Sequence, residues 1–94
     1  MFRAAIVALG LFAVPAFAAH YEAKPAERPS AEKIVLRDLM WKCGDAGCAA
    51  GKSASRPAIV CAVLAREVGR LESFTVAGRP LDPASLEKCN ARAQ

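Results

Sequence analysis

Four cysteines constrain this chain of 94 residues more strongly than any other feature of its sequence; they are Cys43, Cys48, Cys61 and Cys89. A chain of this length buries only a small apolar core, so covalent cross-links would contribute a large share of its stability. Cysteines form lasting disulfides in oxidising compartments and are kept reduced in the cytosol. The four thiols therefore predict a cross-linked domain, provided that the chain leaves the cytosol.

The N-terminus predicts that it does, because it has the three-part layout of a secretory signal peptide. Arg3 and the amino group supply positive charge, residues 4–14 form an uninterrupted apolar run, and Pro15 precedes the small-x-small pattern of Ala16-Phe17-Ala18. The run is shorter than the ~20 residues that a membrane-spanning helix needs. We expect residues 1–18 to be a signal peptide cleaved after Ala18, with cleavage after Ala16 as the alternative, and the mature protein to be periplasmic or secreted.

The start of the mature chain is expected to be a flexible tail over residues 19–33. Within it, HYEAKPAERPSAEK contains two prolines, three acidic and three basic residues, and little that could be buried. Cleavage also removes Arg3, which leaves 12 of the 13 basic residues against nine acidic ones, a net charge of +3. This small basic charge and the single Trp41 do not predict nucleic-acid binding. The charge would mildly suit an acidic protein or an anionic envelope surface.

The rest of the chain, residues 34–94, is expected to be a small α+β domain. Apolar residues at period two predict a strand over residues 34–43, with a helix as the alternative because Leu36, Leu39 and Met40 also suit period 3.6. The glycine-rich residues 44–54 predict a loop. A helix should follow, with Ser55 as its N-cap, Pro57 in its first turn and Gly69 at its C-terminus.

A short strand over residues 72–76 is expected next, stopped by the turn residues 77–80. Asp82 as N-cap and Pro83 in the first turn then predict a helix over residues 84–93. The predicted order is strand, loop, helix, short strand and helix.

The positions of the thiols favour one disulfide pairing among the three that four cysteines allow. Cys61 and Cys89 are expected near the inward edges of the two helices, so a bond between the helices is geometrically natural. Cys43 and Cys48 would then close the loop CGDAGC, in which Gly44 and Gly47 allow a sharp turn. The crossed pairings have a similar chain entropy and stay open.

Other uses of the thiols fit the spacing less well than structural disulfides do. A zinc site usually has two close cysteine pairs, whereas Cys61 and Cys89 are far apart in the sequence. A haem link would need C-x-x-C-H, which is absent from the sequence. The remaining alternative is a thiol-based protein that uses Cys43 and Cys48 for redox chemistry or metal capture, although these residues lack the C-x-x-C spacing.

Enzymatic activity is not expected from this sequence, and neither is a cofactor. The single histidine, His20, lies close to the predicted cleavage site, so acid–base catalysis lacks its usual residue. Gly51-Lys52-Ser53 resembles the end of a phosphate-binding loop, but Ala46 stands where the leading glycine should be. Arg66 and Arg70, one helical turn apart, could form an anion-facing ridge together with Arg56 or Lys52; the alternative is a solvated helix face.

Long stretches of the chain resemble a family of small, exported, uncharacterised proteins from alphaproteobacteria with four cysteines. The resemblance covers residues 37–90 and is carried by the motifs LMWKCGDAGC, SRPAIVCAVLAREVG and LEKCN. It implies that the four cysteines and residues 55–69 are the frame of the domain, and it brings no catalytic residues. We therefore expect an exported, non-enzymatic module that has an interaction or structural role in the periplasm or envelope.

Overall fold

The computed structural model describes residues 19–93, and the expected signal peptide of residues 1–18 lies outside this range. The elements in chain order are β1 (Tyr21–Pro25), β2 (Lys33–Leu36), β3 (Leu39–Gly44), β4 (Gly47–Ala50), α1 (Pro57–Val68), β5 (Leu71–Val76), β6 (Arg79–Pro80) and α2 (Pro83–Asn90).

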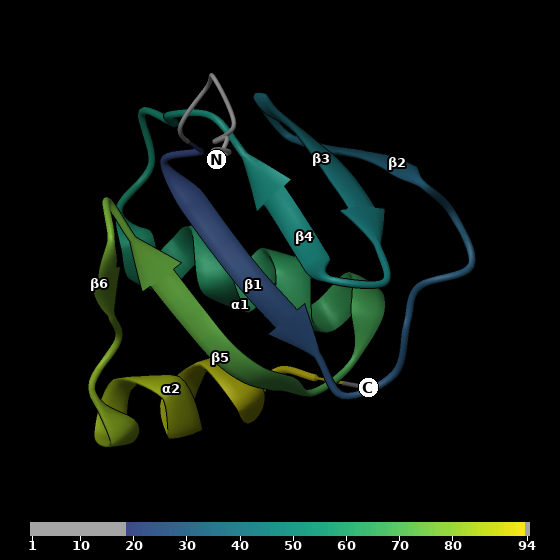
Figure 1. The fold of residues 1–94 in the computed structure, drawn as a ribbon. Coiled ribbons are helices and arrows are strands. Elements are labelled where there is room, and N and C mark those ends of the chain that lie inside the picture. Colours follow the sequence, from purple (N-terminus) through teal and green to yellow (C-terminus); the bar gives the residue numbers. More distant parts are fainter. Residues whose placement is uncertain (1–18, 94) are drawn as a thin grey trace, which may run out of the picture.

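The described strands form one antiparallel sheet in the order β2-β3-β4-β1-β5-β6. Helix α1 lies across one face of this sheet, and α2 packs beside it near β5 (Figure 1). The α+β class and the presence of disulfides agree with the sequence-based prediction. The predicted element order is incomplete, because four strands rather than one precede α1.

The predicted flexible tail of residues 19–33 is wrong for its first part, which forms the strand β1 inside the sheet. Tyr21 pairs with Ala50 of β4 on one side and with Val76 of β5 on the other. Along β1 the odd-numbered residues are buried and Glu22 and Lys24 are exposed, a period-two alternation. The composition of the whole segment concealed this alternation, since charged residues and prolines outnumber the inward-facing side chains.

The predicted single strand over residues 34–43 is also wrong, because the chain reverses at Arg37 and Asp38. These two residues connect β2 to β3, and Arg37 has a φ of 58°. A turn of two residues changes the phase of the alternation, so that Leu39 and Trp41 face the same side of the sheet as Ile34. A straight strand would have placed them on opposite sides, which explains why both sides of the sequence pattern looked apolar.

The predicted loop over residues 44–54 contains a fourth strand, β4, which pairs with β3 and with β1. The turn between β3 and β4 ends at Gly47, whose φ is 125°. A Cβ atom on Gly47 would lie 2.6 Å from the carbonyl oxygen of Ala23 in β1. Glycine is therefore needed at this position so that β4 can approach β1.

The helix α2 ends at Asn90, three residues before the predicted end at residue 93. The other predicted starts and ends of the two helices are present, with one exception. Asp82 caps α2 by accepting a hydrogen bond from the backbone amide of Ser85 at 3.1 Å. Gly69 ends α1 with a φ of 95°, and its amide donates to the carbonyl oxygen of Ala65. The exception is the N-cap of α1, which is Arg56 rather than Ser55 and makes no side-chain cap bond.

The core lies between the sheet and α1, where three aromatic rings meet. Tyr21, Trp41 and Phe74 come from β1, β3 and β5, with ring centroids 5.8 to 6.3 Å apart. They are at most 2% exposed. Such burial of large rings is the main apolar contribution to the stability of this domain. Among the described residues, the hydrophobic core consists of Tyr21, Ala23, Leu39, Trp41, Cys43, Cys48, Ala50, Val60, Cys61, Leu64, Ala65, Leu71, Phe74 and Cys89.

Candidate functional site

Both disulfides join buried residues, and the pairs are those favoured from the sequence. Cys43 and Cys48 are directly opposite in β3 and β4, and their exposed fractions are 9% and 3%. Cys61 of α1 is bonded to Cys89 of α2, and these residues are 0% and 4% exposed. Within residues 19–93 the structure contains no free cysteine.

The burial of Cys43 and Cys48 bears on the thiol-based alternative. Redox-active cysteines are accessible to an attacking thiolate and lie in electropositive surroundings. Here both sulfur-bearing residues face the core, on the side of the sheet that α1 covers. In the residues that the structure describes, no cluster of three or more His, Cys, Asp or Glu side chains could hold a metal ion. We find no structural feature that favours a thiol-based function.

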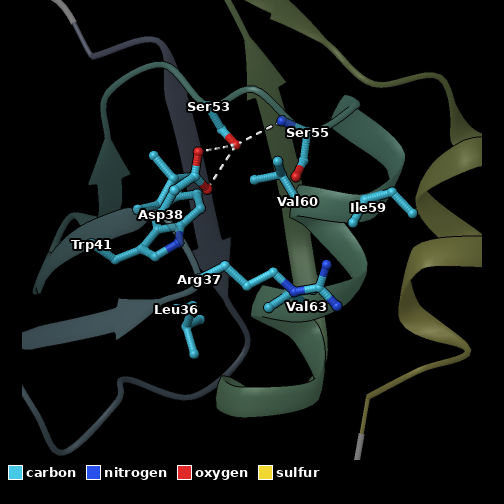
Figure 2. Close-up of a pocket in the computed structure, with 10 residues that line it drawn as sticks. Leu36, Arg37, Asp38, Trp41, Ser53, Ser55, Ile59, Val60 and Val63 are labelled. Atoms are coloured by element: carbon cyan, nitrogen blue, oxygen red, sulfur yellow. Dashed lines mark hydrogen bonds between the residues drawn. The ribbon is translucent and has the colours of Figure 1, made fainter.

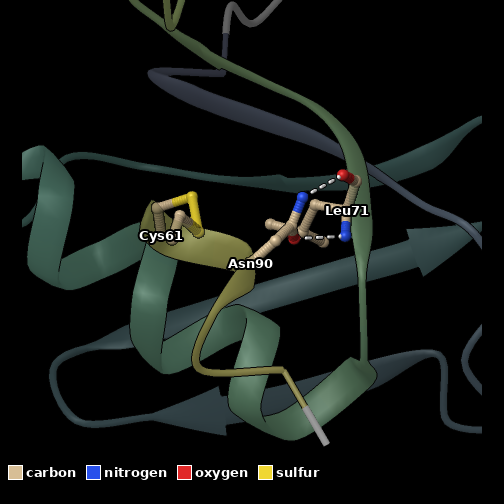
Figure 3. The surroundings of a disulfide bond; sticks show 4 residues. Cys61, Leu71 and Asn90 are labelled. Carbon is tan, nitrogen blue, oxygen red and sulfur yellow. Dashed lines mark hydrogen bonds between the residues drawn. A yellow bond between two sulfur atoms is a disulfide. The ribbon is translucent and has the colours of Figure 1, made fainter. Parts of the chain in front are cut away.

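The bond between Cys61 and Cys89 is accompanied by a side-chain clamp at the end of α2 (Figure 3). Asn90 accepts a hydrogen bond from the amide of Leu71 and donates one to its carbonyl oxygen, each at 2.8 Å. The side-chain amide thus satisfies both backbone groups of the first residue of β5. The disulfide holds α2 on α1, and Asn90 holds α2 on the sheet. Sequence analysis missed this role, because asparagine in a terminal helical turn carries no distinctive spacing.

A second polar cluster connects the β2–β3 turn to the segment before α1 (Figure 2). The Asp38 carboxylate accepts hydrogen bonds from Ser53 Oγ at 3.0 Å and from the amide of Ala54 at 3.2 Å. Ser53 Oγ in turn accepts from the amide of Ser55 at 3.0 Å. The crevice beside this cluster has a volume of about 10 Å³, about the space of a single water molecule.

The electrostatics of this cluster follow from its hydrogen bonds. The hydrogen bond from the Ala54 amide, together with that from Ser53, lowers the pKa of Asp38 below its usual value. A carboxylate with a lowered pKa is a weak base near neutral pH, so it does not activate the Ser53 hydroxyl as a nucleophile. We interpret the cluster as an anchor that positions the segment before α1 on the β2–β3 turn.

The face of the sheet opposite α1 is shallowly hollowed over β1, β4 and β5. The hollow has a volume of about 340 Å³. Its floor is formed by short side chains of neighbouring strands, such as Ala49, Ser73 and Thr75, and Glu22 and Lys24 of β1 also line it. Short side chains at these outward positions leave the backbone of the central strands close to the surface.

The expected arginine ridge is only partly assembled. Arg66 and Arg70 are exposed at the C-terminal end of α1. Arg56 is the N-cap of the same helix, about 15 Å from Arg66 at the rise of an α-helix. Arg56 therefore lies at the opposite end of α1 from Arg66 and Arg70. Anion binding by Arg66 and Arg70 stays a prediction.

Fold and site together define a class: a small α+β domain whose antiparallel sheet is covered by helices on one face and stabilised by two buried disulfides. In the described part of the chain, no helix is long and apolar enough to cross a membrane. The pattern of a family of unknown function (DUF8200) matches residues 7–91, so the chain belongs to this family. Searches of curated proteins and of solved structures gave no match.

Proposed function

We propose that the protein is exported and acts, once oxidised, as a non-enzymatic interaction or structural module of the periplasm or the cell envelope. The observation that carries this proposal is the burial of two disulfides in a domain with a small core. Such bonds form and persist in oxidising compartments. The charged start, the apolar run of residues 4–14 and the small-x-small pattern of Ala16-Phe17-Ala18 support the export part of the proposal.

The non-enzymatic part of the proposal rests on the roles of two carboxylates. Asp38 and Asp82 both hold backbone amides, and these hydrogen bonds, with those from Ser53 and Ser85, lower the pKa of each carboxyl group. Carboxylates used in this way are poor general bases near neutral pH. The interaction part rests on the surface, where Val35 and Met40 are 70% and 49% exposed next to one another on β2 and β3.

The export half can be tested with an epitope-tagged full-length chain in a bacterial host. We expect the tagged protein in the periplasmic or secreted fraction, with Ala19 at its N-terminus by mass spectrometry. All four cysteines should resist alkylation until a reductant is added. The matched control is the double variant Val7→Arg and Leu11→Arg, which interrupts the apolar run and should stay in the cytosol with free thiols. A wild-type chain that is full length, cytosolic and wholly reduced would contradict the proposal.

The interaction half can be tested by chemical cross-linking in intact cells of the native host. We expect a discrete cross-linked species that contains the tagged protein and that is absent from cells carrying an untagged copy. Recovery of the tagged protein only as an uncross-linked monomer, with several reagents, would contradict binding and leave a purely structural role.

A further inference from the structure

We propose that the free edge of β2, residues Lys33–Leu36, binds an extended acidic segment of a partner protein as an added strand. This site is called the β2 edge. The inference rests on the interaction role proposed above and deepens it by naming the surface and the chemistry of the partner. Figure 1 shows β2 as the outermost strand on its side of the sheet.

The hydrogen-bond pattern shows which backbone groups of β2 point away from the sheet. The amide of Cys43 donates to the carbonyl oxygen of Glu32 at 2.8 Å, which makes these two residues a hydrogen-bonded pair. Hydrogen-bonded pairs alternate with non-bonded pairs along an antiparallel ladder. Ile34 and Leu36 therefore direct their backbone groups toward β3, whereas Lys33 and Val35 direct theirs toward the free edge.

These outward groups are available for a new strand. Within residues 19–93, no loop or side chain forms a hydrogen bond with the backbone of Lys33 or Val35 from the side of the edge. The opposite edge of the sheet differs, because β6 has only two residues and one of them is Pro80, which has no N–H to donate. The β2 edge is thus the edge of this sheet that can accept a strand.

The side chains at the β2 edge indicate what the added strand should carry. Lys33 lies directly opposite Lys42 of β3 on the uncovered face, and like charges in such a pair repel one another. The ion pair between Arg28 and Asp45 is the only one within residues 19–93, so neither Lys33 nor Lys42 is ion-paired. An acidic residue opposite Lys33 on an added strand would offset this repulsion.

The next row on the same face is apolar. Val35 and Met40 are directly opposite one another and largely exposed. An added strand with an apolar side chain two residues from its acidic one would cover Val35 while its acid faces Lys33. The partner segment is therefore expected to carry an acidic and an apolar residue two positions apart, so that both lie on the same face of the added strand.

Two alternative roles of the β2 edge agree less well with its side chains. Lysine at an edge strand guards against uncontrolled pairing, but a guarded edge would not present an exposed Val35 at its other outward position. A second copy of the chain could also add its own β2. In the two-fold antiparallel register centred on Val35, however, Lys33 of one copy would face Arg37 of the other, so charge disfavours self-association in that register.

The proposal can be tested by NMR titration of the purified, disulfide-bonded protein with the capped hexapeptide Val-Thr-Glu-Thr-Val-Thr, in which a valine lies two residues to either side of the glutamate and so on the same face of a strand. We expect amide shifts confined to β2 and β3, and slower hydrogen exchange at Lys33 and Val35. Exchange at Ile34 and Leu36 should change little, because their amides already bond to β3. The same hexapeptide with lysine in place of the glutamate is the control and should cause no such shifts.

Two sets of variants separate the contribution of backbone hydrogen bonds to peptide binding from the contribution of charge. Val35→Pro removes an N–H that β3 does not use, which an edge strand tolerates. It should weaken peptide binding by about tenfold, with Val35→Ala as the control for loss of the side chain. Lys33→Glu keeps the backbone intact and should also weaken binding by about fivefold or more, with the effect reduced at high salt. This second variant keeps the test valid if Val35→Pro does not fold.

Three results would overturn the proposal: no localised shifts at millimolar peptide, unchanged binding by both Val35→Pro and Lys33→Glu, or shifts centred on Arg66 and Arg70. Concentration-dependent dimerisation through β2 without peptide would show that a second copy is the occupant and would also overturn it. These failures are distinct from failure of the proposed function. A partner cross-linked to another surface of the domain would contradict the β2-edge proposal but agree with the proposed function. A cytosolic, reduced chain would contradict the proposed function even if the peptide bound to the β2 edge.

Discussion

At the scale of single residues, Gly47 shows how one missing side chain sets the spacing of the central strands. Its φ is 125°, and an added Cβ would meet the Ala23 carbonyl oxygen at 2.6 Å. We predict that Gly47→Ala lowers the free energy of unfolding by more than about 2 kcal/mol, because the backbone strain and the clash with another strand act together. Urea unfolding followed by circular dichroism measures this. Gly51→Ala is the matched control, because a Cβ there meets nothing within 4 Å. Equal losses in the two variants would refute this account of Gly47.

At the scale of elements, the position of α2 depends on Asn90 as well as on the disulfide. The Asn90 side chain bonds both the amide and the carbonyl oxygen of Leu71, 19 positions away in the sequence. Asn90→Ala would leave two partly buried backbone groups without partners, so we predict a loss of about 1–3 kcal/mol in the free energy of unfolding. Lys88→Ala, at an exposed position of the same helix, should stay within about 0.5 kcal/mol of wild type. Thermal unfolding distinguishes the two, and an unshifted midpoint for Asn90→Ala would show that the clamp contributes nothing.

The success of sequence analysis also differs between elements, for physical reasons. The helix α1, the strand β5 and the helix α2 were predicted because their signals are local: Pro57, Gly69 and Asp82 mark the ends. The β2–β3 hairpin was missed because its turn contains Arg37 at positive φ, where glycine or asparagine would have been recognised. The strand β1 was missed because its partners, β4 and β5, lie far along the chain, and no local pattern reports a distant partner.

The candidate sites follow the same division. The pairing of the cysteines could be inferred from the faces of the two predicted helices. The β2 edge could not, since it exists only once residues 33–44 are recognised as a hairpin rather than one strand. The Asp38 cluster likewise depends on that hairpin, because it brings the turn to Ser53, 15 positions further on.

At the scale of the whole molecule, the two disulfides are expected to contribute unequally. A cross-link stabilises mainly by reducing the entropy of the unfolded chain, so a longer ring contributes more. The ring of Cys61 and Cys89 spans 28 positions and that of Cys43 and Cys48 spans five. We predict that the pair Cys61→Ala and Cys89→Ala costs about 3.6 kcal/mol and the pair Cys43→Ala and Cys48→Ala about 2.2 kcal/mol. Urea unfolding of both double variants gives the comparison. A larger loss on removing the shorter ring would mean that the entropy of the unfolded chain does not set the order.

The place of β1 has a consequence for biogenesis. Only two residues separate Tyr21 from the expected cleavage point after Ala18, yet Tyr21 pairs with Ala50 and with Val76. β1 would be the first strand to leave a translocation channel, but it could pair with both β4 and β5 only after most of the polypeptide had emerged. A peptidase would meet an extended, still unpaired substrate during that delay, so the order of events would favour trimming first and sheet closure afterwards.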